Sequence, residues 1–246
     1  MDTDTYKLAW TREESLQQLN KRIHDGVPPD RLWDRAVDRR DTFFDVLFPY
    51  AQPPSGAQVL ELGSGVGWIM QAMLARFAIA SITGLDISKN MTEKAQQRWQ
   101  DPRASYMVYD GQSINLPDDM FDNIYSVACI QHIEKHHAFI IFEELLRILK
   151  PGGHATLHLL SIHFLPKVKK PYREECLNHI NQVPTHWHHY YSYDEIYVLF
   201  AEILQVTDLD IQLRGTSFWI HFSKNTEHRF HSEETRQNYF LNRMRK

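Results

Sequence analysis

Three glycines at every second position constrain this chain more than any other feature of its sequence. Gly63, Gly65 and Gly67 follow an apolar run that contains one acid, Glu61. Apolar residues at helical spacing then continue from Trp68 to Ala78. Glycine tolerates positive φ and lets a ligand approach the bare backbone closely. The stretch therefore predicts a buried strand, a tight turn with a ligand site, and the first turn of a helix.

Length and composition favour one soluble α/β domain with extensions. The chain has 246 residues, of which 43% are hydrophobic and 24% charged, so it can bury a large core. Its formal net charge of -4 gives no electrostatic reason to expect nucleic acid. No apolar run reaches the roughly eighteen residues of a membrane span, and the first residues lack a secretory-signal layout. We expect a cytoplasmic protein without a membrane or nucleic-acid partner, and a homodimer stays open.

Strand and helix patterns alternate through the middle of the chain. The expected strands after the first lie at 81–85, 104–109, 121–129, 155–160, 206–214 and 217–224. Helical patterns separate most of them, which predicts a doubly wound sheet. The last two strands meet at Gly215-Thr216 and form a hairpin. We therefore expect an α/β, Rossmann-like fold with a seven-stranded, mostly parallel sheet, a C-terminal antiparallel hairpin and an N-terminal helical segment.

We divide the chain into three parts. Residues 1–56 contain a capping-box pattern and an apolar helical pattern, so we expect a helical segment that either packs on the sheet edge or forms a lid. Residues 57–225 hold the expected ligand-binding domain, and the irregular stretch 161–191 inside it is an acceptor-side insertion of a length that is usually functional. Residues 226–246 are polar, which predicts a terminal helix or tail.

Acids fall at the ends of the first three expected strands, at Glu61, Asp86 and Asp110. In an open parallel sheet, ligands bind beyond the carboxyl ends of the strands. A carboxylate after the second strand can accept both hydroxyls of a ribose, and one after the third can accept from an adenine amine. Asp86 and Asp110 can also be turn or helix-cap acids. Three carboxylates on one rim nevertheless favour a nucleoside ligand.

Several motifs resemble those of the class I S-adenosylmethionine (SAM) methyltransferases. The acid and glycines of the first stretch are similar to motif I of that family. Four further matches follow in order: Thr83–Ser88 as motif II, Leu116-Pro117 with Phe121-Asp122, the ending His132-Ile133, and Leu149-Lys-Pro-Gly-Gly153. The resemblance covers residues 57–160 and implies a SAM-dependent methyltransferase. A dinucleotide-binding loop would instead need a glycine where this chain has Trp68.

The resemblance also assigns residues to the parts of SAM. The methionine part would be flanked by Glu61, Gly63, Ser64, Gly65 and Gly67. By the same resemblance, Asp86 would hold the ribose and Ile87 would pack on the adenine. Asp110 and Gly111 would then contact the adenine edge.

The acceptor side has its own candidates. His132, at the end of the fourth strand, is the best candidate for a general base, although such a histidine can also pack beside the cofactor without acid–base chemistry. An acceptor pocket with aromatic walls and neutral imidazoles would be lined by His186, His188, His189 and Tyr190. A solvated loop is the alternative. We expect no metal, since no Cys or carboxylate stands at a familiar ligand spacing.

The sequence thus predicts a SAM-dependent methyltransferase that acts on an O or N atom of a small molecule, such as a metabolite, a sugar or a natural-product intermediate. No Asp/Asn-Pro-Pro-Tyr motif follows the fourth strand, and Cys129 falls within that strand, so methylation of nucleobases is not expected. Two alternatives stay open. One is a protein or tRNA methyltransferase, which only the basic C-terminal residues support, and the other is a SAM-binding interaction module without transferase activity.

Overall fold

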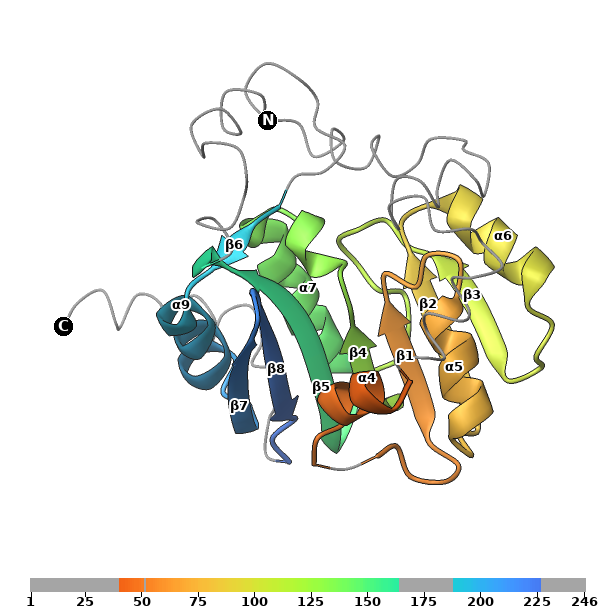
Figure 1. Cartoon of the computed structure of the whole chain (residues 1–246), viewed down its shortest axis with the longest axis horizontal. Coiled ribbons are helices and arrows are strands. Elements are labelled where there is room, and N and C mark those ends of the chain that lie inside the picture. The colour runs from red at the N-terminus through yellow and green to blue at the C-terminus, as the bar shows by residue number, and fades with distance from the viewer. Residues whose placement is uncertain (1–39, 51, 164–187, 227–246) are drawn as a thin grey trace, which may run out of the picture.

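The computed structural model describes residues 40–50, 52–163 and 188–226. One sheet of eight strands forms its centre, with the order β3-β2-β1-β4-β5-β8-β7 and with β6 paired to β5 off this path (Figure 1). The strands are β1 (Gln58–Leu62), β2 (Ser81–Asp86), β3 (Ala104–Val108), β4 (Phe121–Ser126), β5 (Leu149–Ser161), β6 (Tyr190–Tyr191), β7 (Thr207–Arg214) and β8 (Ser217–Ser223). Only the pairs that involve β8 are antiparallel. This confirms the Rossmann-like, mostly parallel fold with its C-terminal hairpin.

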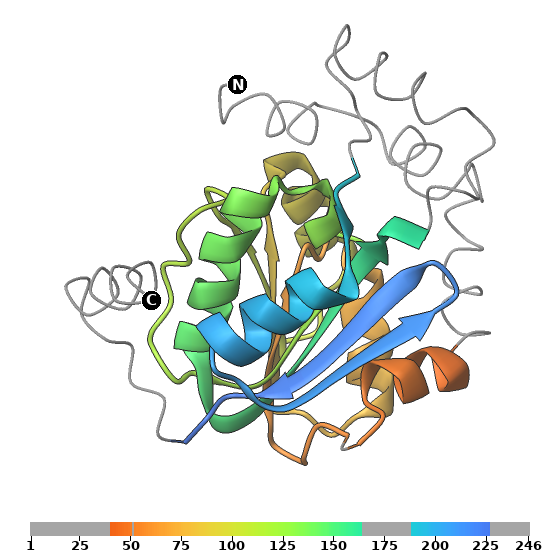
Figure 2. The same cartoon turned by 90° about the vertical axis from the view of Figure 1, so that its left-hand side faces the viewer.

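Helices cover both faces of the sheet (Figure 2). One core cluster packs beneath α7 and α9, and a second packs beneath α4 and α5. A π-helix, η3 (Val198–Ile203), continues α9, and a 3₁₀ turn, η1, follows β4. The helices are α4 (Arg40–Leu47), α5 (Trp68–Arg76), α6 (Lys89–Arg98), η1 (Ile130–His132), α7 (Lys135–Ile148) and α9 (Tyr193–Tyr197).

The strand order reverses between β1 and β4. The chain passes from β1 outward to β2 and β3, then returns to place β4 on the other side of β1. Glu61 of β1 is in register with Gly84 of β2 and with Tyr125 of β4, so these strands end at one edge. Ligands bind at such a switch point in open α/β sheets. The topology therefore puts the glycine turn after β1 at the expected binding edge.

Three details differ from the sequence-based expectation. The sheet has eight strands instead of seven, since it includes the two-residue β6. This strand was not predicted because it lies at the end of the irregular stretch 161–191, which has no strand pattern. β4 ends at Ser126, and Ala128 has a positive φ of 54°, so Cys129 lies after the strand and not within it. β5 already begins at Leu149, since a register shift between Phe121 and Asn123 of β4 accommodates the Pro-Gly-Gly segment.

Parts of the proposed division fall outside the described residues, namely residues 1–39, 164–187 and 227–246. Of the N-terminal segment, α4 and the loop toward β1 are described. Among the helices of the described part, none has the length and apolar character needed to cross a membrane.

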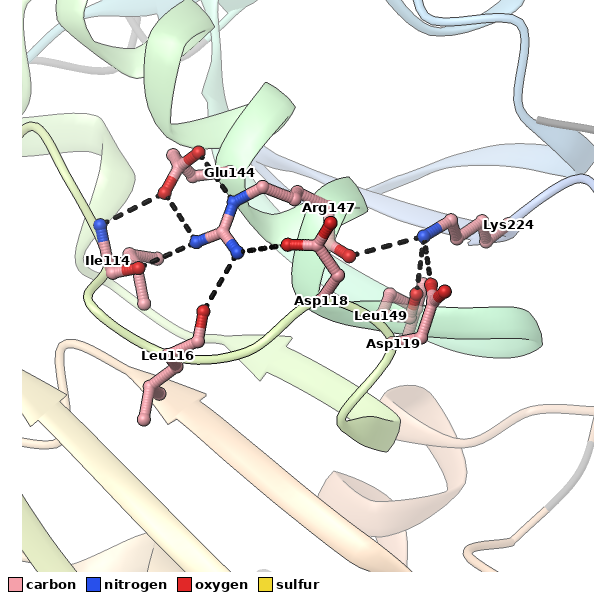
Figure 3. A network of polar contacts seen from close by, with 8 residues as sticks. All are labelled: Ile114, Leu116, Asp118, Asp119, Glu144, Arg147, Leu149 and Lys224. Carbon is pink, nitrogen blue, oxygen red and sulfur yellow. Dashed lines mark hydrogen bonds and ion pairs between the residues drawn. The ribbon is translucent and has the colours of Figure 1, made fainter. Parts of the chain in front are cut away.

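A polar network fastens α7 to the loop before β4 and to the end of β8 (Figure 3). The Arg147 guanidinium donates to both Glu144 oxygens at 2.9 and 2.8 Å and to Asp118 at 2.6 Å. It also donates to the carbonyls of Ile114 and Leu116. Lys224, only 4% exposed, donates to Asp119 and to the carbonyls of Arg147 and Leu149. These two cations add hydrogen bonds to carbonyls at the helix end and in the loop, and two of these carbonyls, those of Ile114 and Arg147, also accept backbone N–H groups.

Replacing Arg147 with Gln should destabilise the fold by about 1.5–3 kcal/mol, the usual scale of charged hydrogen bonds. Burial alone would raise the pKa of Glu144, but hydrogen bonds from Arg147 and Ile114 outweigh it, so that pKa is lowered. A lowered carboxyl pKa contributes stability above the unfolded pKa and loses it as pH falls through the folded value. The difference between wild type and variant in urea denaturation should therefore shrink under acidic conditions. Lys89→Gln, which removes an exposed pair with Glu93, is the control and should cost little.

Candidate functional site

The turn after β1 depends on glycine for two separate reasons. All three of its glycines have positive φ, with 77° at Gly63, 53° at Gly65 and 81° at Gly67. A Cβ at Gly63 would lie 2.3 Å from Cβ of Cys129, and one at Gly67 would lie 2.8 Å from the Tyr106 ring. At Gly65, however, the one atom of the described residues that a Cβ would meet is the Met91 sulfur, at 3.7 Å. The outer two glycines thus allow close packing of the turn, and the middle one leaves its backbone open.

The Asp86 carboxylate holds this turn in place. Asp86 is the last residue of β2, and its Oδ2 accepts the backbone N–H of Gly65 at 2.8 Å. Its Oδ1 accepts the N–H of Ser88, also at 2.8 Å, at the residue that caps α6. Burial raises the pKa of Asp86, although these backbone hydrogen bonds counteract the rise. One carboxylate therefore joins the loop after β1 to the loop after β2.

Glu61 lies beneath the turn and faces the core. Its side chain is 2% exposed, and Oε2 accepts the hydroxyl of Tyr125 at 3.1 Å. Burial raises the pKa of Glu61 well above its usual range, and the Asp86 charge adds to this, while hydrogen bonds from Tyr125 and the Met70 backbone lower it. The structure thus separates Glu61 from the other two acids, since its carboxylate is enclosed by β4 and α5.

Asp110 is exposed and closes a turn of its own just beyond β3. Its Oδ1 accepts the backbone N–H groups of Gln112 and Ser113 at 2.8 and 2.7 Å. Its Oδ2 accepts the Ser113 hydroxyl at 2.9 Å. Gly111, with a φ of 82°, lies within this turn. Asp110 and Asp86 therefore reach the same edge of the sheet from neighbouring strands, and both act as turn acids in this structure.

On the other side of the switch point, residues 188–190 lie near the residues that follow β4. His132 ends η1, and its ring centroid lies 4.9 Å from that of His188. The N–H of His189 donates to the Gln131 carbonyl at 2.7 Å, and Tyr190 pairs with Leu160 of β5. Burial lowers the pKa of His189, which favours its neutral ring. Three of the four predicted acceptor-side residues are thus close to His132, and His186 lies outside the described residues.

One group in the described part of the chain has the arrangement of metal ligands. Glu134, His136 and His137, at the start of α7, place one ligand atom each within 4.8 Å of one another. His136 already pairs with Glu134 at 3.3 Å and is largely exposed. The sequence analysis did not consider this group, because its ligands are adjacent in sequence and lack a familiar spacing.

The sequence of this chain is similar to those of known methyltransferases. A model of a methyltransferase domain matches residues 59–153. The methyltransferase GfsG of Streptomyces halstedii is 28% identical over 140 residues, which cover 55% of this chain and 49% of that protein. The ubiquinone/menaquinone biosynthesis C-methyltransferase UbiE of Desulfotalea psychrophila is 31% identical over 124 residues, covering 50% of this chain and 46% of that one.

Residues 59–153 therefore resemble a methyltransferase domain, and the proteins similar to this chain are class I SAM-dependent methyltransferases. The PH0226 protein from Pyrococcus horikoshii OT3 shares the fold, with a TM-score of 0.63 at 20% identity, over 84% of this chain and 96% of that one. The chain spans about half the length of the curated relatives it matches. SAM is the cofactor of this family, as the sequence predicted.

The edge of the methyltransferase domain fits SAM in charge and in hydrogen bonding. The Asp86 oxygens accept the backbone N–H groups of Gly65 and Ser88, and the Ile87 backbone also hydrogen-bonds to this carboxylate. Two carboxylate oxygens offer about four acceptor positions, so the carboxylate can still accept a ligand hydroxyl. Among the described residues, no Lys or Arg contributes to the pKa shift of Asp86, so its negative charge suits a cationic sulfonium ligand. The open backbone at Gly65 lies beside this carboxylate.

Sequence reasoning missed His158, which lies on β5 near the acceptor edge. Its Nδ1 accepts the N–H of Ala128 at 3.3 Å, and its ring meets the Trp219 ring with centroids 4.9 Å apart. Burial lowers the pKa of His158 to about 4, so the ring stays neutral. The signal was the alternation of polar residues at His154, Thr156 and His158 along the strand expected at 155–160.

Gly63→Ala should destabilise the methyltransferase domain more than Gly56→Ala does. Both glycines have nearly the same φ, 77° and 80°, so both variants incur the left-handed strain of about 1–2 kcal/mol. A Cβ at Gly56 meets no described residue within 4 Å, whereas the contact with Cys129 at Gly63 should cost about 1–3 kcal/mol more. Urea denaturation of both variants measures the difference. Equal losses would show that close packing against Cys129 is not what requires Gly63.

Proposed function

We propose that this protein transfers the methyl group of SAM to an O or N atom of a small-molecule acceptor. The observation that carries the proposal is the meeting of His132 and His188 at the sheet edge that also holds the Asp86-supported glycine turn. The Asp86-supported turn, which we propose binds the nucleoside of SAM, follows β1 and β2, and the two imidazoles lie on the β4 side of the switch point. This is the arrangement that a two-substrate transfer needs.

The first role of the chain is to hold the methyl donor. We assign the ribose hydroxyls to Asp86, because its carboxylate lies at the end of β2 beside the open backbone of Gly65. The methionine part would lie along Gly63–Gly67, with Ile87, Asp110 and Gly111 near the adenine, as in the family that the motifs resemble. For Glu61 we propose a positioning role, since its carboxylate contacts Tyr125 below the turn.

The second role is to align the acceptor and remove its proton. SAM supplies an electrophilic methyl group on a sulfonium, and the transfer is an in-line displacement in which alignment lowers the barrier. A hydroxyl acceptor must also lose a proton, and a neutral imidazole can take it. His132 is our candidate base, and His188, His189 and Tyr190 would line the acceptor side.

A carbon acceptor is the second candidate, because the relative UbiE is named a C-methyltransferase. An activated aromatic carbon also reacts faster once a neighbouring hydroxyl is deprotonated, so the same base would serve. Incubating the full chain with labelled SAM and pooled metabolites, then locating the label, decides between oxygen, nitrogen and carbon. A chain that binds SAM but labels no small molecule would favour an interaction module.

Asp86→Asn should weaken SAM binding by about 1.5–3 kcal/mol, since it removes the charge that accepts the ribose hydroxyls. Isothermal titration calorimetry with SAM and S-adenosylhomocysteine measures the loss. Asp194→Asn, at an exposed position of α9, is the matched control and should bind like wild type. Thermal unfolding without ligand shows whether the loop itself has changed. Unchanged SAM affinity in a folded Asp86 variant would mean that the ribose lies elsewhere.

His132→Ala should lower the turnover of the identified acceptor by about 10²-fold or more, the usual contribution of a general base. His136→Ala, which removes a largely exposed ring from the start of α7, serves as its control. SAM affinity should be the same in both variants, because neither ring lies at the glycine turn. A His132 variant that keeps turnover within about threefold of wild type would exclude it as the base.

A further inference from the structure

Three side chains with metal-ligating atoms come together at the start of α7. Glu134, His136 and His137 each offer one ligand atom, and these atoms lie within 4.8 Å of one another. Glu134 and His137 are three residues apart, a spacing that brings side chains to one side of a helix. None of the three belongs to the residues assigned to SAM or to the acceptor, so the proposed methyl transfer leaves this group without a role.

The contact between Glu134 and His136 has the length expected for two ligands of one ion. Oε2 of Glu134 lies 3.3 Å from Nε2 of His136. Two atoms bonded to a tetrahedral Zn²⁺ at about 2.0–2.1 Å lie about 3.3–3.4 Å apart. The rings of His136 and His137 are adjacent as well, with centroids 4.1 Å apart. A modest rotation of the Glu134 and His136 side chains therefore brings all three ligand atoms onto one ion.

The group is open to solvent on one side and closed by the protein on the other. The side chains of His136 and Glu134 are 68% and 24% exposed. His137 is buried and forms the inner wall of the group. An ion taken up by the two outer ligands is already within reach of His137, because the ligand atoms lie at most 4.8 Å apart. No passage through the protein is needed.

The Glu134 carboxylate is available as a ligand although Glu134 is the N-cap residue of α7. Its side chain makes no capping hydrogen bond with the helix. Lys135, which stands between the ligands in the chain, donates to both Glu195 oxygens at 2.7 Å and lies over the Tyr191 ring. Its charge is thus balanced by Glu195 on α9. The positive end of the α7 dipole disfavours a cation, and the Glu134 carboxylate offsets this.

The donor set of two imidazoles and one carboxylate selects the kind of metal. Imidazole nitrogen suits transition metals such as Zn²⁺, whereas Mg²⁺ and Ca²⁺ prefer oxygen ligands. Three protein ligands leave the fourth position of a tetrahedral Zn²⁺ to water or another small ligand. The sequence analysis expected no metal, because ligands so close in the chain lack a familiar spacing. The turn into α7 nevertheless brings them together.

We propose that Glu134, His136 and His137 bind Zn²⁺, with the fourth coordination position open to solvent. The proposal assigns the ion no part in methyl transfer. The comparison of His132→Ala with His136→Ala is therefore made in buffer that contains a chelator, where neither variant holds the ion.

Isothermal titration of the full, chelator-treated chain with ZnCl₂ should show one site that millimolar Mg²⁺ does not block. The chain has 14 histidines, so matched variants must locate the ion. Glu134→Gln and His136→Ala should each weaken Zn²⁺ binding by about tenfold or more, since even changes outside the ligand shell cost about 10–100-fold. His154→Ala, which removes an exposed histidine on β5 opposite Asn123, is the control and should bind like wild type. Wild-type affinity in both ligand variants, or no binding by the wild-type chain, would overturn the proposal.

A crystal soaked in ZnCl₂ locates the ion without any substitution. The anomalous signal of zinc should lie about 2.0–2.2 Å from a Glu134 oxygen and from one ring nitrogen each of His136 and His137. A peak on His136 alone, or no peak at this group, would also overturn the proposal, because Glu134 and His136 would then form an ordinary ion pair. SAM titration in chelator reports on the glycine turn alone, so a failure here is distinguishable from a failure of the methyl-transfer proposal.

Discussion

The contact on which this structure most depends is the one between the Asp86 carboxylate and the backbone N–H of Gly65. It connects two loops that come from adjacent parallel strands, and it adds to the backbone hydrogen bonds that Gly63 and Ser64 donate to the carbonyl of Leu85 in β2. The same carboxylate also binds the N–H of Ser88, whose hydroxyl caps α6. The glycine turn, the start of a helix and the acid that would meet the ribose are therefore held as one unit. Rigid placement of this kind is what a binding edge requires.

The sequence predicted this unit because each of its parts is local. A glycine turn, an acid at a strand end and a Ser cap are all patterns of a few residues, and each agrees with its neighbours. The sequence did not distinguish the roles of the acids. Glu61 lies within β1 and points into the core toward Tyr125, whereas Asp86, the last residue of β2, turns toward the loop. Strand alternation decides this, and the exact strand ends that set it are hard to predict.

Other features depend on contacts between distant residues and have no local signature. The early end of β4 follows from the positive φ of Ala128, whose N–H reaches His158 thirty positions later. The partner of His221 is Thr156, which only the antiparallel pairing of β5 with β8 brings near. β6 consists of two residues and exists only because β5 extends far enough to receive it. Register across the sheet, rather than sequence pattern, places these groups.

The position of β8 has a consequence for how the chain is made. β8 lies between β5 and β7, although β7 precedes it in the chain. Among the described strands, β7 pairs with β8 alone. It therefore has no strand to pair with until β8 has been synthesised and has emerged from the ribosome. The glycine turn near residue 63 emerges much earlier, yet the sheet beneath it stays incomplete through most of translation. A nascent chain that stalls before residue 217 would thus expose the edge of β5, and a chaperone or a second nascent chain would find a ready template there.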